Sequence, residues 1–196
     1  MEKHKVIHRF IEKLPVKLLI FLFINILNFF QQFFKNFLIF LIINFKRNKK
    51  MKIAIASDHA GFEYKQKISV WLMTNEHQIL DFGCFSEDSV DYPDYGFPAA
   101  EAVASGIAQY GILICGTGIG MSITANKVVG IRAACCTTAT MAKLARNHNN
   151  ANVLTLGARI ISCELAEKII DEFLRQEFNG ERHLIRIEKI HSISGR

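Results

Sequence analysis

The sequence predicts an α/β fold, a doubly wound three-layer α/β/α sandwich with a five-stranded parallel sheet. Three observations support this prediction. Short apolar runs rich in β-branched residues, of which 112–114 is the clearest, are typical of buried parallel strands. These runs alternate with helical segments about five times along the chain. A glycine-rich turn at 116–120 joins the central strand to the next helix. With right-handed crossovers, this alternation forms one parallel sheet covered on both faces.

Charge is divided unevenly along the chain. The 196 residues carry a formal net charge of +6. Residues 1–50 hold ten Lys or Arg and two Glu, which is +8, so the remaining 14 basic and 16 acidic residues amount to −2. The part beyond residue 50 is therefore mildly acidic, and we expect no nucleic-acid partner.

Residues 1–50 form a leader that differs in composition from the rest of the chain. The leader has no Ala or Gly and holds ten of the 16 Phe. Its stretch 18–45 is apolar apart from scattered Asn, Gln and Lys, and 46–50 is basic, so its length and positive flank suit a membrane anchor. No small-residue cleavage site follows, which argues against a cleaved secretory signal.

Three interpretations of the leader remain open: a membrane anchor, an organelle-targeting segment and a mis-assigned start. Phe, Ile, Asn and Lys are what AT-rich DNA encodes, and Met51 opens a well-formed strand. We expect two parts, the leader 1–50 and a folded domain 51–196, in a cytoplasmic protein. A membrane or organellar location follows only if the leader is genuine. A native intact mass that includes residues 1–50 would exclude a start at Met51.

The cysteines indicate a reducing compartment. Five are present, an odd number, with no C-x-x-C pair, no His-rich spacing and no secretion signal. We therefore expect reduced thiols and no metal site. The five are Cys84, Cys115, Cys135, Cys136 and Cys163.

The folded domain opens with a strand, a turn and a helix. Residues 52–57 (KIAIAS) form a buried apolar run, and 58–61 turns at its carboxyl end. Apolar positions near helical spacing predict a helix over 62–75. The run HQILDF predicts a second strand over 77–82.

A polar loop and the central strand follow. The loop covers 83–92, and Tyr92-Pro93 leads into a helix from about 94 to 109. The central strand ends at Cys115. After the glycine turn, 121–127 can be helical.

The last part of the chain repeats the alternation of strand and helix. Ser162 is the expected N-cap of a long amphipathic helix. Strands are expected over 131–135 and 152–156, and helices over 138–148, 162–178 and 182–191.

Candidate chemical groups gather at one edge of this sheet, because ligands of such sheets bind beyond the carboxyl ends of the strands. Asp58 and His59 follow the first strand, Cys115 ends the third, and Arg159 follows the fifth. Backbone N–H groups of the glycine turn 116–120 point at one spot near a helix N-terminus, which suits an anion. Thiols in such places tend to ionise readily, so Cys115 is a candidate base.

Each candidate also has an ordinary structural interpretation. The glycine spacing matches neither G-x-G-x-x-G nor the P-loop, so the turn could be a tight connection with a buried structural cysteine. Asp58 could be a helix cap, and His148 a C-cap that favours the helix dipole. Arg182 and Arg186 share a helix face that could simply be solvated. Together, however, these groups form a set suited to an anionic substrate, and paired guanidinium groups suit a phosphate.

The same residues carry a resemblance to a known family. The stretch 51–194 resembles the type B ribose-5-phosphate isomerases, a family that also holds galactose-6-phosphate and allose-6-phosphate isomerases. The leader lies outside it. The carrying motifs are SDHAG at 57–61, DYP at 91–93, ICGTGIG at 114–120, ANK at 125–127, GIRA at 130–133, His148-Asn149, NVL at 152–154, GAR at 157–159, and Arg182-His183 with Arg186.

The resemblance implies an aldose–ketose isomerase that uses no metal and no organic cofactor. Cys115 would be the base that moves a proton between carbons 1 and 2, through an enediolate stabilised by backbone N–H groups. His148 would be the acid for ring opening. By the same resemblance, Asp58 and Thr117 would contact the sugar hydroxyls. The phosphate would be bound by His59, Arg182 and Arg186. Further substrate contacts would be Tyr92, Gly116, Gly118, Ile119, Gly120, Asn149 and Arg159.

The resemblance also implies a homodimer, or a dimer of dimers, with the site at the interface. His148, Asn149 and Arg159 would come from the partner chain. Ribose 5-phosphate is the substrate the resemblance favours, in the non-oxidative branch of the pentose phosphate pathway. Two alternatives remain, a six-carbon sugar-phosphate isomerase and a phosphosugar- or nucleotide-binding module without turnover. The presence of both Cys115 and His148 favours the enzyme.

Overall fold

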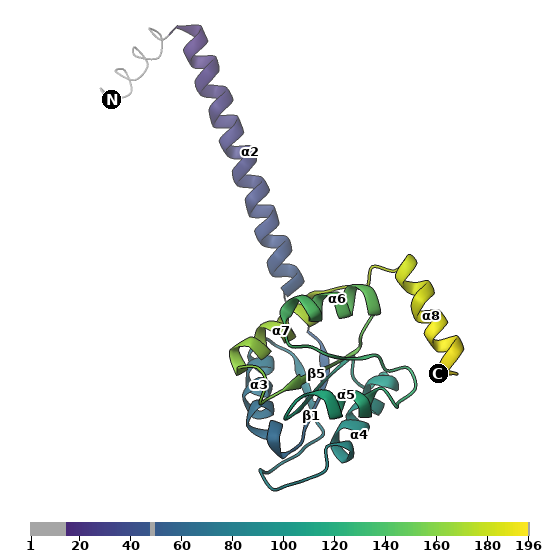
Figure 1. Ribbon diagram of the computed structural model, residues 1–196. Coiled ribbons are helices and arrows are strands. Elements are labelled where there is room, and N and C mark those ends of the chain that lie inside the picture. Colours follow the sequence, from purple (N-terminus) through teal and green to yellow (C-terminus); the bar gives the residue numbers. More distant parts are fainter. Residues whose placement is uncertain (1–14, 48–49, 196) are drawn as a thin grey trace. The chain divides into compact units, whose positions relative to one another are not determined.

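The computed structural model describes residues 15–47 and 50–195. The chain divides into two units, one up to Arg47 and one from residue 48 onward (Figure 1). The first contains one long described helix, α2 (Val16–Arg47). The interpretation of residues 1–50 as a membrane anchor, an organelle-targeting segment or a mis-assigned start stays a prediction.

Helix α2 exposes much of its apolar surface. Its polar positions Asn25, Asn28 and Gln32 recur at spacings of three and four, so they lie along one stripe. Phe and Ile side chains such as Phe29 and Phe33 are exposed elsewhere on the helix. Within the described parts of the chain, no helix combines the length and the apolar character needed to cross a membrane.

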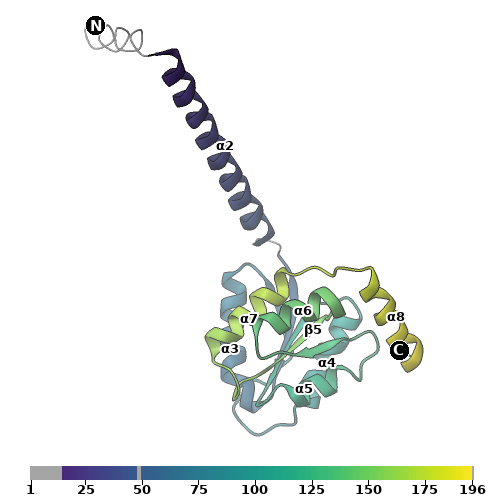
Figure 2. The same cartoon turned by 45° about the horizontal axis from the view of Figure 1, so that its top comes forward.

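The second unit contains the predicted sheet. Five parallel strands pair in the order β2-β1-β3-β5-β4. Strand β5 lies among the helices of this unit (Figures 1 and 2). The doubly wound α/β prediction is thus confirmed. The strands are β1 (Lys52–Ser57), β2 (Gln78–Asp81), β3 (Tyr110–Cys115), β4 (Ala133–Cys135) and β5 (Val153–Gly157).

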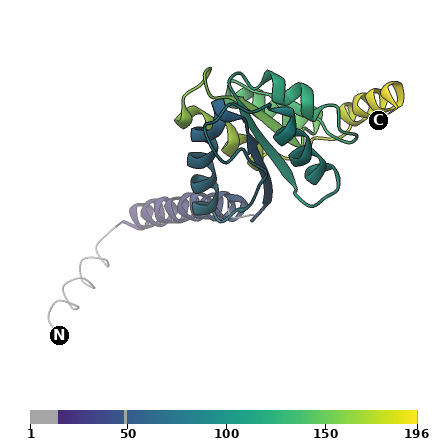
Figure 3. The ribbon, with the colours of Figure 1, turned by 90° about the horizontal axis from the view of Figure 1, so that it is seen from below.

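Side-chain size along the strands separates the two faces of the sheet. In β1, Ile53 and Ile55 point to one face and Ala54 and Ala56 to the other, and all four are fully buried. The isoleucine face packs against α3, α6 and α7, and the alanine face against α4 and α5. Figure 3 shows strands with helices on both sides.

The helices bear out the predicted elements, with changes at their ends. The turn at 58–61 contains a short 3₁₀ helix, η1. Ser162 is the N-cap of α7, as predicted, because its side chain accepts the Leu165 N–H. The bounds are η1 (His59–Gly61), α3 (Phe62–Thr74), α4 (Pro93–Ala104), α5 (Ile119–Ala125), α6 (Ala139–Asn149), α7 (Cys163–Arg175) and α8 (Arg182–Ser194).

Two predicted helices were too long at their carboxyl ends. The helix expected to reach 109 ends at Ala104, because Ser105 caps the Glu101 carbonyl and Gly106 turns with a φ of +76°. The helix expected to reach 178 ends at Arg175, where Gln176 is already extended.

Other boundaries shift by a few residues. Helix α5 starts at Ile119, two residues before the predicted start, and ends at Ala125. Strand β4 is confined to Ala133–Cys135. Helix α8 runs on to Ser194 rather than ending near His191.

Candidate active site

The carboxyl edge of the sheet brings together the groups predicted to lie there. Strands β1, β3 and β5 are neighbours, and Cys115 is paired with Gly157 at the last rung. Asp58 and His59 follow β1, Cys115 ends β3, and Arg159 lies just beyond β5. The candidate base and the glycine turn therefore sit between the loops of two flanking strands.

Cys115 is buried and its sulfur faces the turn that follows it. Only 4% of the residue is exposed. The Gly118 N–H donates to Cys115 Sγ at 3.1 Å, and the Ile119 N–H donates to Thr117 Oγ1 at 3.3 Å. The backbone of the turn therefore fixes the position of the Cys115 sulfur at the end of β3.

Glycine is required at the centre of this turn. Gly118 has a φ of +79°, in the left-handed region. A Cβ there would lie 2.9 Å from the Leu156 carbonyl carbon and 3.0 Å from Cys135 Sγ. The turn is therefore pressed directly onto β5 and the end of β4, and its N–H groups are held in place by close packing.

Tyr92 and Arg159 flank the turn on two sides. A Cβ on Gly120 would lie 2.8 Å from the Tyr92 ring, so the ring rests on the Gly120 backbone. A Cβ on Gly116 would lie 3.4 Å from Arg159 Cδ, and the Arg159 N–H donates to the Gly116 carbonyl at 3.0 Å. Arg159 thus reaches the glycine turn of its own chain.

Asp58 and His59 are fixed by backbone contacts. Asp58 is buried, and its Oδ1 accepts the Gly61 N–H at 3.0 Å, which is the capping role considered from the sequence. His59 Nδ1 lies 3.2 Å from the Val90 nitrogen and 3.3 Å from the Val90 oxygen. The loop 83–92 therefore holds the His59 ring.

The remaining candidates lie at the opposite edge of the sheet. His148 and Asn149 end α6, just before the amino end of β5. Arg182 and Arg186 are exposed on the first turns of α8. Their position is set by α6, because the His148 and His183 rings stack at a centroid distance of 4.2 Å and an angle of 6°.

Segment 176–179, which precedes α8, is hydrogen-bonded to the end of α6. The Asn179 N–H donates to the Asn147 carbonyl at 3.0 Å, and Asn147 Nδ2 donates to the Glu177 carbonyl at 2.6 Å. Burial lowers the pKa of His183, electrostatic interaction with His148, Arg182 and Arg186 lowers it further, and Glu181 opposes the shift. His183 thus tends to stay neutral beside His148.

The predicted site is consequently divided within one chain. Strand β3 between Gly111 and Cys115 separates the two edges by roughly 13 Å of extended backbone. The carboxyl edge holds the thiol and the amide groups. The amino edge holds the imidazole pair and the two guanidinium groups.

A cavity of about 370 Å³ lies on the amino-edge side rather than over Cys115. Asn126, Arg132, Asn149 and His191 give it a polar margin, and apolar residues of α8 and of 128–134 form its remaining wall. Among the described residues, no group of three His, Cys, Asp or Glu side chains is placed to hold a metal ion.

Two features of the site were not singled out from the sequence. His183 was noted only as part of a motif, and its stacking on His148 depends on how α8 meets α6. Lys65 is fully buried and pairs with Asp81, although a lysine on an amphipathic helix normally indicates the solvated face. No local pattern could have indicated either contact.

Comparison with known proteins gives consistent matches over the second unit. The Ribose/Galactose Isomerase family matches residues 53–190. The chain is 50% identical over 141 residues to the putative sugar phosphate isomerase YwlF of Bacillus subtilis, covering 71% of this chain and 95% of the relative. It is 45% identical over 145 residues to ribose-5-phosphate isomerase B of Escherichia coli, covering 74% and 97%.

Solved structures agree with these matches. Ribose-5-phosphate isomerase B of Clostridium thermocellum superposes with a TM-score of 0.73 at 50% identity, covering 74% of this chain and 98% of that one. The Mycoplasma genitalium enzyme with bound ribulose-5-phosphate gives 0.71 at 42% identity, covering 74% and 97%. On its fold, its site motifs and these matches, the chain belongs to the ribose/galactose isomerase family of sugar phosphate isomerases.

Proposed function

We propose that this isomerase interconverts ribose 5-phosphate and ribulose 5-phosphate by proton transfer at Cys115. The observation that carries the proposal is the buried Cys115 sulfur at the end of β3, with the Gly118 N–H donated to it at 3.1 Å. A relative that is 45% identical over 97% of its own length is named ribose-5-phosphate isomerase B, which supports the five-carbon substrate.

In the proposed reaction, the Cys115 thiolate removes the proton from carbon 2 of the open-chain aldose. The electron pair forms the carbon–carbon double bond of an enediolate, and the carbonyl oxygen on carbon 1 takes up negative charge. Returning the proton to carbon 1 and moving the hydroxyl proton from oxygen 2 to oxygen 1 produces the ketose. The N–H groups of the turn 116–120 lie beside the sulfur and are suited to stabilise this oxyanion, an effect worth a few kcal/mol per donor elsewhere.

The surrounding groups have roles that fit their positions. Asp58 and Thr117 would orient the sugar hydroxyls near the sulfur, and Tyr92 and Arg159 would border the substrate beside the turn. His59 would contact the phosphate. At the other edge, Arg182 and Arg186 provide two guanidinium groups one helical turn apart, which suit a doubly charged phosphate.

We further propose that a second copy completes the site. His148 and Asn149, together with Arg182 and Arg186, lie at the far edge of their own sheet. A second chain can therefore supply the ring-opening acid, a substrate contact and the two guanidinium groups for the phosphate, which one chain does not bring to its own Cys115 and His59. Exposed apolar side chains support such an interface. They include Ile119 and Ile123 on α5 and Ile185, Ile190 and Ile193 on α8. Arg159 already reaches the glycine turn of its own chain, so its contribution does not depend on the partner.

We also propose a cytoplasmic enzyme of the non-oxidative pentose phosphate pathway. The alternatives are an isomerase of galactose 6-phosphate or allose 6-phosphate and a phosphosugar-binding module without turnover. The family includes galactose isomerases by its description, which keeps the six-carbon substrates as the second candidate.

The test is turnover of ribose 5-phosphate by the full chain beside its Cys115→Ala variant. We expect the substitution to lower kcat by roughly 100-fold or more, because a positioned general base contributes about that much. Cys163→Ala is the matched control, since this thiol lies at the start of α7 and should leave kcat unchanged. Unchanged kcat in Cys115→Ala would assign the base elsewhere. Turnover only of six-carbon phosphates, or binding without turnover, would select the corresponding alternative.

A further inference from the structure

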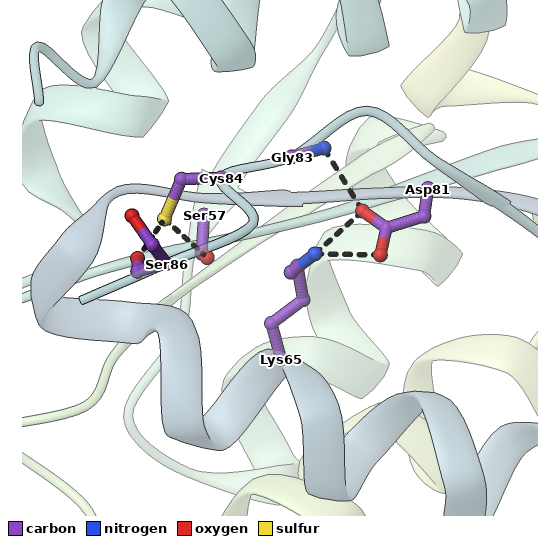
Figure 4. A network of polar contacts seen from close by, with 6 residues as sticks. All are labelled: Ser57, Lys65, Asp81, Gly83, Cys84 and Ser86. Carbon is purple, nitrogen blue, oxygen red and sulfur yellow. Dashed lines mark hydrogen bonds and ion pairs between the residues drawn. The ribbon is translucent and has the colours of Figure 1, made fainter. Parts of the chain in front are cut away.

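Helix α3 carries a lysine whose charge is entirely inside the protein. The Lys65 side chain has no exposed surface, and its Nζ lies 2.6 Å from both carboxylate oxygens of Asp81 (Figure 4). The ammonium also lies 5.0 Å from the Phe85 ring centroid and 5.9 Å from that of Phe62. A buried cation with one carboxylate partner and two aromatic neighbours is expensive to desolvate, so its presence calls for an explanation beyond stability.

Asp81 also forms a hydrogen bond with the loop that follows β2. Its Oδ1 also accepts the Gly83 N–H at 2.9 Å (Figure 4). The Gly83 carbonyl accepts the Ser57 N–H at 2.6 Å, and the Cys84 N–H donates to the Ser57 carbonyl at 2.7 Å. Ser57 is the last residue of β1 and directly precedes Asp58. The ion pair is therefore two hydrogen bonds away from the backbone that positions Asp58.

The start of the loop is also held by sulfur contacts. Cys84 Sγ lies 3.7 Å from Ser57 Oγ and 3.3 Å from the Ser86 carbonyl (Figure 4). Gly83 is pinned from the other side, since a Cβ there would lie 2.5 Å from the Tyr95 ring. The loop thus leaves β2 in one defined direction.

The far end of the same loop reaches the candidate active site. Val90 lies at hydrogen-bond distance from His59 Nδ1, and the Tyr92 ring rests on Gly120. The loop 83–92 therefore contacts the end of β1 where the loop begins. Where the loop ends, it contacts both His59 and the glycine turn.

We infer that the Lys65–Asp81 ion pair is a positioning pair for substrate binding: it fixes the direction of the loop 83–92, and through the loop it orients His59 and Tyr92. The inference rests on the proposed function for its catalytic readout. Neither Lys65 nor Asp81 touches the substrate in this assignment. Cys115 and the turn amides are held separately by β3 and β5, so the pair affects binding more than proton transfer.

The choice of variant follows from the unequal burial of the two partners. The Asp81 side chain is 33% exposed, so water can reach the carboxylate once the ammonium is removed. Removing Asp81 alone would instead leave a charged lysine in the interior, which is strongly destabilising. Lys65→Met keeps the aliphatic stem and is the primary variant. The double variant Lys65→Met with Asp81→Asn removes both charges and retains an oxygen for the Gly83 N–H.

Lys67→Met is the matched control. Lys67 lies on the same helix and forms an ion pair of the same length, 2.6 Å to Glu63, with side chains that are 56% and 69% exposed. An exposed pair of this kind contributes little, so this variant should keep the wild-type KM and kcat.

The experiment measures KM and kcat for ribose 5-phosphate in the full chain and these variants. We expect Lys65→Met to raise KM roughly tenfold while kcat stays within about twofold, because lost uniform binding raises KM alone. A purely structural role would reduce the folded fraction, which lowers the apparent kcat and leaves KM unchanged. If Lys65→Met does not fold, the same comparison of KM and kcat is made with the double variant.

Hydrogen exchange provides a readout that does not require turnover. In Lys65→Met, the amides of Gly83, Cys84 and Val90 should exchange faster while those of β3 keep their protection. An unchanged KM in active, folded variants, or unchanged exchange of these three amides, would overturn the inference. If the wild type itself does not isomerise ribose 5-phosphate, the proposed function fails, and the exchange result alone decides whether the pair positions the loop.

Discussion

Gly118 occupies a position where backbone conformation and packing both exclude a side chain. Its φ of +79° lies in the left-handed region, and the carbonyl carbon of Leu156 would be 2.9 Å from an added Cβ. Its own N–H is the group donated to Cys115 Sγ. Gly118 therefore both allows the turn to pack against β5 and donates a hydrogen bond to the proposed base.

Gly118→Ala should be more damaging than a comparable substitution elsewhere. Gly106 is the matched control, because its φ is +76° but nothing lies within 4 Å of an added Cβ. We expect Gly106→Ala to lower the free energy of unfolding by about 1 kcal/mol from backbone strain alone. Gly118→Ala should cost more and should also lower kcat. Urea unfolding and steady-state kinetics measure both, and equal losses in the two variants would contradict the packing argument.

At the scale of elements, the starts of β1 and β2 are joined by a histidine. The Met51 N–H donates to His77 Nδ1 at 3.3 Å, which requires an unprotonated nitrogen. Burial lowers the pKa of His77, opposed by the nearby negative charge of Asp171. The folded state therefore resists protonation of this ring more than the unfolded chain does.

This pKa shift predicts a stability that decreases in acid. As pH falls below about 6.5, the unfolded chain takes up a proton at His77 that the folded chain takes up only at lower pH, so the free energy of unfolding falls. His77→Gln should make the decrease between pH 7 and pH 5 shallower than in the wild type. Urea unfolding at several pH values measures the two slopes. Parallel slopes would mean that His77 does not titrate differently in the two states.

At the scale of the whole molecule, the division of the candidate site between two sheet edges is the main result. Helix α6 begins beyond the carboxyl end of β4 and must return to the amino end of β5, so His148 at its end lies opposite to Cys115. This follows from the topology of any parallel β-α-β crossover. In our proposal, a second copy supplies the groups that one chain does not bring to its own Cys115.

Mixed dimers test this arrangement directly. Cys115→Ala and His148→Ala chains should each be inactive as homodimers, the second because ring opening loses its acid. In a coexpressed mixture, half of the dimers would be mixed, and each mixed dimer would contain one intact site of two. Activity should therefore return to about a quarter of the wild-type value. No recovery in a mixture shown to contain mixed dimers would place Cys115 and His148 of one site in the same chain.

The accuracy of the sequence predictions differed with the range of the interactions involved. The strand over 52–57, the N-cap Ser162 and the strand end at Cys115 were confirmed, because apolar runs and capping residues act locally. The predicted end of the helix at 109 was wrong. The helix ends at Ala104, because Ser105 caps the Glu101 carbonyl and the chain turns at Gly106. The roles of the site residues stay predictions that the proposed experiments address.

The sequence by itself determined the alternation of elements, and with it the parallel sheet and the edge at which Asp58, Cys115 and Arg159 meet. Those properties depend on the spacing of apolar residues and on strand direction, which can be inferred from residues close together in the sequence. Only the tertiary structure decided that Lys65 is buried against Asp81 and that His183 stacks on His148. Each of these contacts joins two elements, and their meeting depends on how whole helices pack against the sheet and against one another.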